Sequence, residues 1–201
     1  KAGIRANLFV DPLSRVRHAL SAAVQRRPRR VAVVGADLPG VMAGYALERM
    51  VPDSVRCLVD RLGSRLQGAK SHGYQFADDR IESAVAAMDG PPDLVVVADS
   101  CADSVNLALE SCAPGGTVLL LAPPPLETAP PDLAAIWQRG IRLLPGAGRS
   151  PDDVARAIEW VEDLSERLDA IPLRELPFER GGEARAMLDA DPGLLGVVLK
   201  A

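Results

Sequence analysis

Short apolar stretches that alternate with helical segments constrain the fold of this chain more than any other feature. Residues 31–34 are apolar throughout, which is typical of a parallel strand covered on both faces. Residues 94–98 and 117–121 are similarly rich in Val and Leu, and a further strand is expected at 55–59. Helical segments follow these stretches, so that strand and helix alternate repeatedly. This alternation predicts an α/β fold with a doubly wound parallel sheet of the Rossmann type.

The remaining elements are expected from periodicity and from turn signals. Helices are expected at 13–25, 40–50, 62–72, 79–88 and 133–138, and one more helix contains Val105, Leu109 and Cys112. An extended segment is expected at 73–76, and a late strand at 141–145. A loop is expected to run from residue 122 to Pro131. The tail is expected to hold a strand at 173–176, a short helix near 183–188 and a strand at 197–199. We therefore expect a Rossmann-type domain with a linking helix at 1–171 and an appendage at 172–201.

The run Ser150-Pro151-Asp152-Asp153 predicts the start of a helix. Ser150 is a favourable N-cap residue, proline is favourable at the first helical position, and acids in the first turn complement the helix dipole. The apolar side of this helix is expected to contain Val154, Ile158, Val161, Leu164 and Leu168.

Composition narrows the classes of function. The formal net charge of −4 and the 3% aromatic content favour neither a nucleic-acid surface nor a base-stacking surface. No apolar run approaches the ~18 residues of a membrane span, and nothing resembles a signal peptide, so we expect a cytoplasmic protein. Cys57, Cys101 and Cys112 are too far apart for a C-x-x-C pair, and only two histidines accompany them. We expect no zinc site from this chain, with Cys57 and Cys112 in the core.

The segment from Val31 to Gly40 reads as a strand, a glycine turn and a helix start, and Asp60 lies twenty residues beyond Gly40 at the end of the next strand. This is the layout of a unit that binds NAD or NADP. The candidate cofactor-binding residues in the turn are Gly35, Ala36, Asp37, Leu38, Pro39 and Gly40. Gly35 permits the tight turn and Gly40 permits close packing of the helix, so both would persist in a domain that binds nothing.

Asp37 departs from the Gly-x-Gly-x-x-Gly pattern, because it occupies the place of the middle glycine. In that pattern the backbone at this position approaches the pyrophosphate, and a carboxylate adds both bulk and negative charge. Two like charges about 4 Å apart repel by roughly 1 kcal/mol in water and by several at a surface dielectric, which weakens binding tenfold to a thousandfold. The alternative is that Asp37 caps the following helix and faces solvent.

Asp60 is a candidate for hydrogen bonding to the hydroxyls of the adenosine ribose. An acid there would repel the extra phosphate of NADP, so NAD is the favoured cofactor. Arg61 points the other way, because a guanidinium can pair with a 2′-phosphate. The alternative for Asp60 is a strand end exposed to solvent.

Asp99, Ser100 and Cys101 follow a central strand, at the sheet edge where doubly wound folds bind ligands. A cap of the next helix by Ser100 or Asp103 is the alternative, and no basic neighbour is expected to activate the Cys101 thiol. His72 is expected on the surface in a turn, and His18 is expected to be structural.

Seven segments occur in the order found in one family. They are Phe9 to Ser14 with His18-Ala19-Leu20, Val31 to Gly40, Val59-Asp60-Arg61 with Arg65, Ala69-Lys70, Asp93 to Val97, Cys112 to Val118, and the tail from Leu176 to Lys200. The chain resembles the cofactor-binding half of the medium-chain dehydrogenase/reductase superfamily, which includes zinc alcohol dehydrogenases. The resemblance implies that Arg65 lies in the segment that holds the adenosine ribose.

The resemblance implies an oxidoreductase that transfers hydride between a nicotinamide cofactor and a carbonyl or alcohol carbon. The family's zinc ligands, proton relay and most of its substrate pocket lie in a preceding barrel-like domain, so no catalytic acid or base is expected within these residues. That domain is expected either upstream or in trans, unless the protein naturally lacks it. The resemblance also implies a homodimer through the edge strand near 142–146.

Two alternatives remain open from sequence. Asp37 and the missing catalytic half favour a degenerate, non-catalytic Rossmann domain that serves association or scaffolding. An S-adenosylmethionine-dependent methyltransferase would share the acid after the second strand and the Pro-Gly-Gly turn, but the linking helix and the tail fit it poorly.

Overall fold

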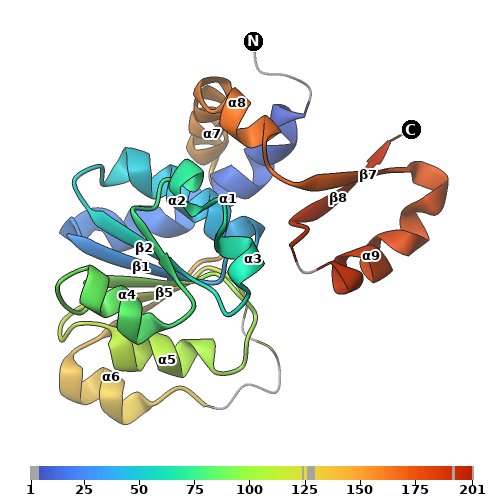
Figure 1. Ribbon diagram of the computed structural model, residues 1–201. Coiled ribbons are helices and arrows are strands. Elements are labelled where there is room, and N and C mark those ends of the chain that lie inside the picture. The colour runs from blue at the N-terminus through green and yellow to red at the C-terminus, as the bar shows by residue number, and fades with distance from the viewer. Residues whose placement is uncertain (1–4, 124, 126–129, 192, 201) are drawn as a thin grey trace.

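The computed structural model describes residues 5–123, 125, 130–191 and 193–200. Six parallel strands form the main sheet, in the order β3-β2-β1-β4-β5-β6 (Figure 1). The strands are β1 (Arg30–Val34), β2 (Val55–Val59), β3 (Phe76–Asp78), β4 (Leu94–Val97), β5 (Thr117–Leu120) and β6 (Arg142–Pro145). This order is that of a doubly wound sheet, so the predicted fold class is confirmed.

Helices cover both faces of the sheet (Figure 1). One face is covered by α1 (Val10–Ala23), α2 (Leu38–Met50), α7 (Pro151–Asp163) and α8 (Ser165–Asp169), and the other by α4 (Ile81–Ala87), α5 (Ser104–Ser111) and α6 (Leu133–Arg139). Short 3-10 turns span Ala6–Phe9 and Val24–Arg26. Of the predicted loop from residue 122 to 131, residues 124 and 126–129 lie outside the described part of the chain.

Successive residues of the central strands enter opposite cores. Val31 and Val33 of β1 pack with α1 and α2, whereas Ala32 and Val34 pack with α4 and α5. All four are almost fully buried, which explains why this strand is apolar at every position. Cys57 and Cys112 are buried in the second core, as predicted.

The order of the strands positions a crevice. The chain moves outward from β1 to β2 and β3, and then returns to place β4 on the other side of β1. The crossovers on the two sides of β1 therefore diverge above the carboxyl ends of β1 and β4. This is the edge at which doubly wound sheets bind their ligands.

The helix start at Ser150 forms as predicted. The Ser150 hydroxyl accepts a hydrogen bond from the N–H of Asp153, and the Asp153 carboxylate accepts one from the N–H of Ser150. The predicted apolar side is wrong at Ile158, which is 50% exposed, because Ala157 faces the core instead. The helix ends at Asp163, and Leu164 and Leu168 reach the core around the break before α8.

The single helix predicted at 62–72 is wrong. The structure has only α3 (Gly63–Leu66) followed by a 3-10 turn at Ala69–His72. Gly68 separates the two pieces, and a Cβ there would lie 2.5 Å from the His72 ring. Gly73 ends the turn in the left-handed region, so the extended segment starts later than predicted, at Phe76.

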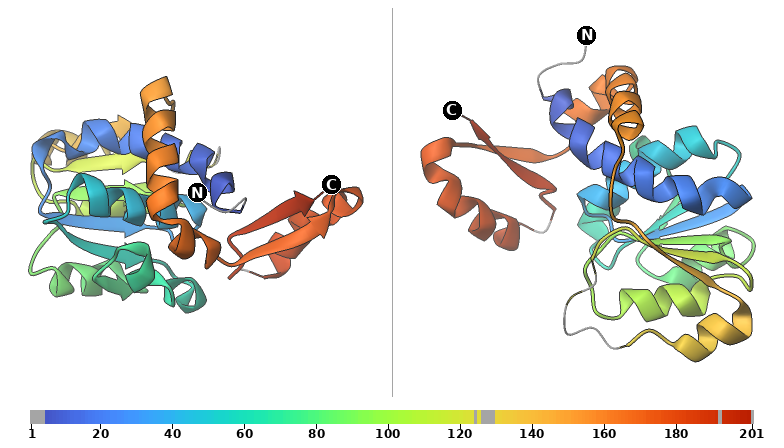
Figure 2. Two further views of the ribbon diagram at one scale, coloured as in Figure 1. Left: turned by 90° about the horizontal axis from the view of Figure 1, so that it is seen from above. Right: turned by 180° about the vertical axis from the view of Figure 1, so that it is seen from behind.

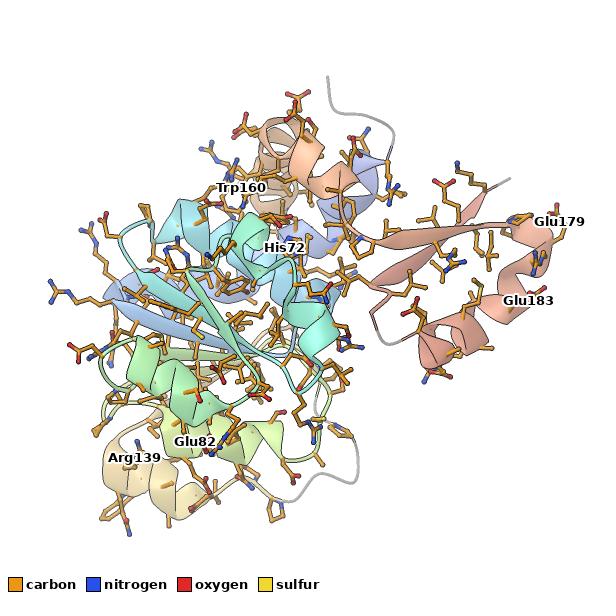
Figure 3. The ribbon with its side chains drawn as sticks, viewed as in Figure 1. His72, Glu82, Arg139, Trp160, Glu179 and Glu183 are labelled. Atoms are coloured by element: carbon orange, nitrogen blue, oxygen red, sulfur yellow. The ribbon has the colours of Figure 1, made fainter. Side chains whose placement is uncertain are left out.

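The tail forms a separate unit beside the main sheet (Figure 2). Its strands β7 (Leu173–Pro177) and β8 (Gly196–Lys200) pair in parallel, and the segment between them holds a 3-10 turn (Phe178–Glu183) and α9 (Ala184–Ala190). Glu179 and Glu183 lie at the end of this unit that is farthest from the main sheet (Figure 3).

Candidate functional site

The glycine turn between β1 and α2 is built by close backbone approach. Gly35 has a φ of +101°, and a Cβ there would lie 2.6 Å from the Cβ of Asp99. A Cβ on Gly40 would lie 1.9 Å from the carbonyl oxygen of Gly35. Both glycines are therefore required by packing, which agrees with the sequence argument that they do not by themselves indicate a ligand.

Asp60 ties the end of β2 to this turn. Its Oδ2 atom accepts a hydrogen bond from the N–H of Ala36 at 2.7 Å, and its Oδ1 atom accepts one from the N–H of Leu62 at 2.8 Å. The side chain is only 8% exposed, so the alternative of a solvent-exposed strand end is wrong. A carboxylate has further lone pairs, and Asp60 borders a cleft, so it retains acceptor capacity for hydroxyl groups.

Asp37 occupies the N-cap position of α2 without capping the helix through its side chain. The carboxylate, 40% exposed, instead forms an ion pair with the Arg65 guanidinium. The predicted cap is therefore wrong, because a guanidinium draws the carboxylate away from the helix N–H groups. Burial raises the pKa of Asp37, Arg65 lowers it, and the carboxylates of Asp60 and Asp99 raise it further.

Two arginines from the segment after β2 reach across this site. Arg65 of α3 is 19% exposed and lies 3.8 Å from Asp60 Oδ2 in addition to its pair with Asp37. Arg61 donates a hydrogen bond to the Sγ atom of Cys101, which follows β4. The expectation that Cys101 has no basic neighbour is therefore wrong, because the ends of β2 and β4 face each other across the cleft.

Asp99, Ser100 and Cys101 lie at the carboxyl end of β4, as predicted. The N–H of Cys101 donates to Asp99 Oδ1 at 3.3 Å, which holds the backbone after the strand. The cap of α5 expected from Ser100 or Asp103 is absent. Asp103 occupies the N-cap position with helical backbone angles rather than the extended ones that aim a side chain at the N–H groups.

These residues line a cleft of about 660 Å³ above the carboxyl ends of β1, β2 and β4. It contains six carboxylates and three guanidiniums: Asp37, Asp60, Asp79, Glu82, Asp99, Asp103, Arg61, Arg65 and Arg80. Glu82, which Figure 3 labels, lines the cleft from the start of α4. Of the candidate residues, the charged ones, Ser100 and Cys101 line this cleft, whereas Gly35, Ala36 and Gly40 lie beneath it in the turn.

A second cavity of about 540 Å³ lies on the other side of the turn. Leu38 and Pro39 of the predicted site line it. The other lining residues were not predicted to belong to a site: Pro12, Arg15, Val16, Leu120, Leu121, Ala122, Pro123, Pro145, Gly146, Ala147 and Gly148. Its lining is apolar except for Arg15. The proline and glycine residues that follow β5 and β6 were the available signal, because ligands bind beyond the carboxyl ends of parallel strands.

The two histidines lie outside both cavities. His72 is buried and not on the surface as expected, because α2 passes close to its turn (Figure 3). Its Nδ1 atom lies 2.8 Å from the Tyr45 hydroxyl, and burial together with Arg167 lowers its pKa to about 4. His18 contacts Asp153 at 2.7 Å and links α1 to α7, which agrees with a structural role.

Two further observations apply to residues 5–123, 125, 130–191 and 193–200. No helix in these ranges is long and apolar enough to cross a membrane. No three His, Cys, Asp or Glu side chains gather there in an arrangement suited to a metal ion.

The chain is similar over its length to parts of known dehydrogenase structures. A short chain alcohol dehydrogenase from Escherichia coli, complexed with NADH, matches with a TM-score of 0.84 and 16% identity, covering 100% of this chain and 60% of that one. An alcohol dehydrogenase from Thermus matches with a TM-score of 0.79 and 24% identity, covering 100% and 59%. A Sinorhizobium meliloti protein described as a zinc-binding dehydrogenase and bound to NADP matches with a TM-score of 0.81 and 20% identity, covering 98% and 59%.

These matches establish the fold. No protein-family model matches the sequence, and no curated protein is significantly similar to it. The chain shares its fold with the matched parts of these alcohol dehydrogenases, as the order of its sequence segments predicted. It spans 59–60% of the length of the three structures described above.

Proposed function

We propose that this chain is the NAD(P)-binding domain of a medium-chain dehydrogenase-like oxidoreductase. The activity would be hydride transfer between the nicotinamide and a carbonyl or alcohol carbon, with this domain orienting the cofactor. The observation that carries the proposal is Asp60, which lies at the end of β2 and accepts a hydrogen bond from Ala36 in the glycine turn at 2.7 Å. This hydrogen bond links the acid that is expected to bind the ribose to the glycine turn that is expected to bind the phosphates.

The two cavities support the same proposal. The polar cleft beside Asp60 suits an adenosine, and the apolar cavity beyond Leu38 suits an uncharged ring such as nicotinamide. A dinucleotide bound across the turn would place its pyrophosphate over residues 37 and 38. The adenosine and nicotinamide ends thus fit the residues present, and Asp37 opposes the phosphates between them.

Asp60 favours NAD over NADP. A 2′-phosphate on the ribose would approach a carboxylate that is 8% exposed and already fixed by two backbone N–H groups. Arg61 is turned toward Cys101, although its guanidinium lines the same cleft. We therefore expect NADH to bind more tightly than NADPH.

Further parts of such an enzyme would come from outside these residues. The parallel pair β7 and β8 is a two-stranded sheet, which is marginal in isolation and suits addition to a larger β-structure. A catalytic domain in the same longer chain or in trans would supply that structure and the acid or base. Strand β6 is the last strand of the main sheet and pairs only with β5 within the described residues, so an edge pairing near 142–146 could form a homodimer.

The second candidate is a non-catalytic Rossmann domain that serves association. The Asp37–Arg65 ion pair favours it, because a charged pair occupies the turn where a dinucleotide would need an open anion site. Such a domain would retain the fold and the strand edges but would not bind a cofactor.

Titration calorimetry with NADH and NADPH, on the wild type and on an Asp37→Gly variant, tests these proposals. The wild type should bind NADH weakly, and the variant should gain at least about tenfold in affinity because a like charge near the phosphates is removed. Asp163→Gly removes an exposed carboxylate of α7 that pairs with Arg49 at 3.5 Å, and it should leave binding unchanged.

The alternative outcomes are distinct. Tight NADH binding by the wild type with no gain in Asp37→Gly would refute the argument about charge at the turn. Failure of both proteins to bind either cofactor would favour the non-catalytic domain.

A further inference from the structure

Arg65 lines the polar cleft close to the glycine turn, which separates this cleft from the apolar cavity. It forms an ion pair with Asp37, it lies 3.8 Å from Asp60, and all three side chains line the polar cleft. Leu38, the residue next to Asp37, already belongs to the apolar cavity. A ligand that occupies both cavities must therefore pass this ion pair.

The charge balance around this ion pair is unfavourable for an anion. Asp37, Asp60 and Asp99 contribute three carboxylates, and Arg65 is the guanidinium paired with the first of them. A guanidinium binds carboxylates and phosphates through the same planar set of N–H donors. The Asp37 carboxylate thus stands where a phosphate oxygen would stand against Arg65.

We propose that the Asp37 carboxylate and the phosphate of the ligand compete for the same cation, the guanidinium of Arg65. This inference rests on the proposed function and adds how the charge of the ligand's phosphates affects its affinity. A phosphate must displace Asp37 from Arg65, and the displaced carboxylate then repels the same phosphate. The domain consequently recognises the adenosine part of a ligand and gains little from its phosphates.

The proposal differs from simple repulsion by Asp37. If Asp37 acted by repulsion alone, neutralising it would raise the affinity for phosphate equally with or without Arg65. Competition requires Arg65, because removal of the competitor is useful only while the cation remains. A double-mutant comparison therefore separates the two explanations.

The experiment titrates the protein with adenosine and with ADP, followed by ligand-observed NMR. The wild type should bind ADP no more than about threefold more tightly than adenosine, because the ion pair cancels the attraction of Arg65 for phosphate. Asp37→Asn keeps the side-chain size and should raise ADP affinity at least about tenfold, while adenosine affinity stays unchanged.

Two more variants complete the comparison. Arg65→Met should reduce ADP binding below that of adenosine, and Asp37→Asn with Arg65→Met should lose most of the gain in ADP affinity. The matched control is Arg156→Met, since Arg156 is an exposed arginine of α7 that pairs with Glu159 at 2.8 Å and lines neither cavity. It should leave the ratio of ADP to adenosine affinity at the wild-type value. Circular dichroism confirms that each variant is folded.

The outcomes distinguish this inference from the proposed function. If the gain in ADP affinity persists undiminished without Arg65, Asp37 acts by repulsion and the competition is refuted. If adenosine binds but no variant changes the ratio, the inference fails and the cofactor-binding proposal stands. If neither ligand binds any variant, both fail.

Discussion

The main sheet and the tail unit are built from similar parallel strands but bury them differently. Every residue of β4 is almost fully buried, between helices on both faces and strands on both sides. In β8 no residue is fully buried, and Leu199 is 41% exposed. The main sheet has its own core on each face, whereas the tail pairs two strands only with each other.

The difference shows which part of this chain supplies its own stability. Two-stranded sheets are marginal in water, because few side chains are removed from solvent. The tail therefore depends on contacts beyond its own strands, such as Leu173 and Leu195 packing against the main core. Mutations should consequently have large effects in the sheet and small effects in the tail.

The largest effect is expected in the centre of the main sheet. Leu58 of β2 is fully buried in the core beneath α2, so Leu58→Ala should lower the free energy of unfolding by about 2–5 kcal/mol. Urea denaturation followed by circular dichroism measures this loss. A loss under about 1 kcal/mol would mean that the sheet is as loosely packed as the tail.

The buried His72 makes the folding of the main domain sensitive to mild acid. The pKa of His72 falls from its ordinary value of 6.5 to about 4 in the folded protein, because burial disfavours the charged ring. The unfolded chain therefore takes up a proton first, and stability present above pH 6.5 is lost as the pH falls towards 4.

The expected loss is about 3 kcal/mol across that range. Denaturation at several pH values measures it, and His72→Gln should flatten the dependence because glutamine does not titrate. A wild-type unfolding free energy that does not change across this range would show that the ring is not shielded from water.

The start of α7 is the next most sensitive point. Although burial alone would raise it, hydrogen bonds from Ser150 and His18 and the charge of Arg17 lower the pKa of Asp153 to about 2. The stability contributed by ionised Asp153 is fully present above its ordinary pKa of 3.8 and is lost as the pH falls through its folded-state pKa of about 2. Asp153→Asn should cost about 2 kcal/mol at neutral pH.

Asp163→Asn is the matched control, since that carboxylate is 71% exposed and its ion pair with Arg49 spans 3.5 Å. It should change the unfolding free energy by less than about 1 kcal/mol. Equal losses in the two variants would show that the buried contacts of Asp153 contribute no more than a surface ion pair.

The smallest effect is expected in the tail. Leu199→Ala should lower the free energy of unfolding by less than about 1 kcal/mol, because its side chain is 41% exposed. The same denaturation assay measures it beside Leu58→Ala. A loss as large as that of Leu58→Ala would contradict the comparison and make the tail part of the cooperative core.

Local patterns predicted the sheet and part of the site. The apolar strands, the turn at Gly35 and the acid at Asp60 were predictable because each depends on a few neighbouring residues and on the fixed order of a doubly wound sheet. The helix start at Ser150 was predictable for the same reason, since a capping box is formed within one turn.

Tertiary contacts account for what the sequence did not predict. The pair of Asp37 with Arg65 depends on the turn after β2, which leads into α3 and brings Arg65 to the start of α2. His72 looked exposed because a glycine follows it, but Gly44 lets α2 approach so closely that a Cβ there would lie 2.1 Å from the His72 carbonyl oxygen. The apolar cavity joins loops after β5 and β6 to α1, and no single segment contains that pattern.

The position of residue 37 between two cavities also bears on how a ligand for this cleft would be assembled. A dinucleotide is two fragments joined by a tether, and the tether raises the effective concentration of the second fragment once the first is bound. Over Asp37 a charged tether loses part of that advantage, whereas an uncharged one of equal length keeps it. If a dinucleotide binds across the turn as proposed, the cleft would therefore select on the chemistry of the linker as well as on the fragments at its ends.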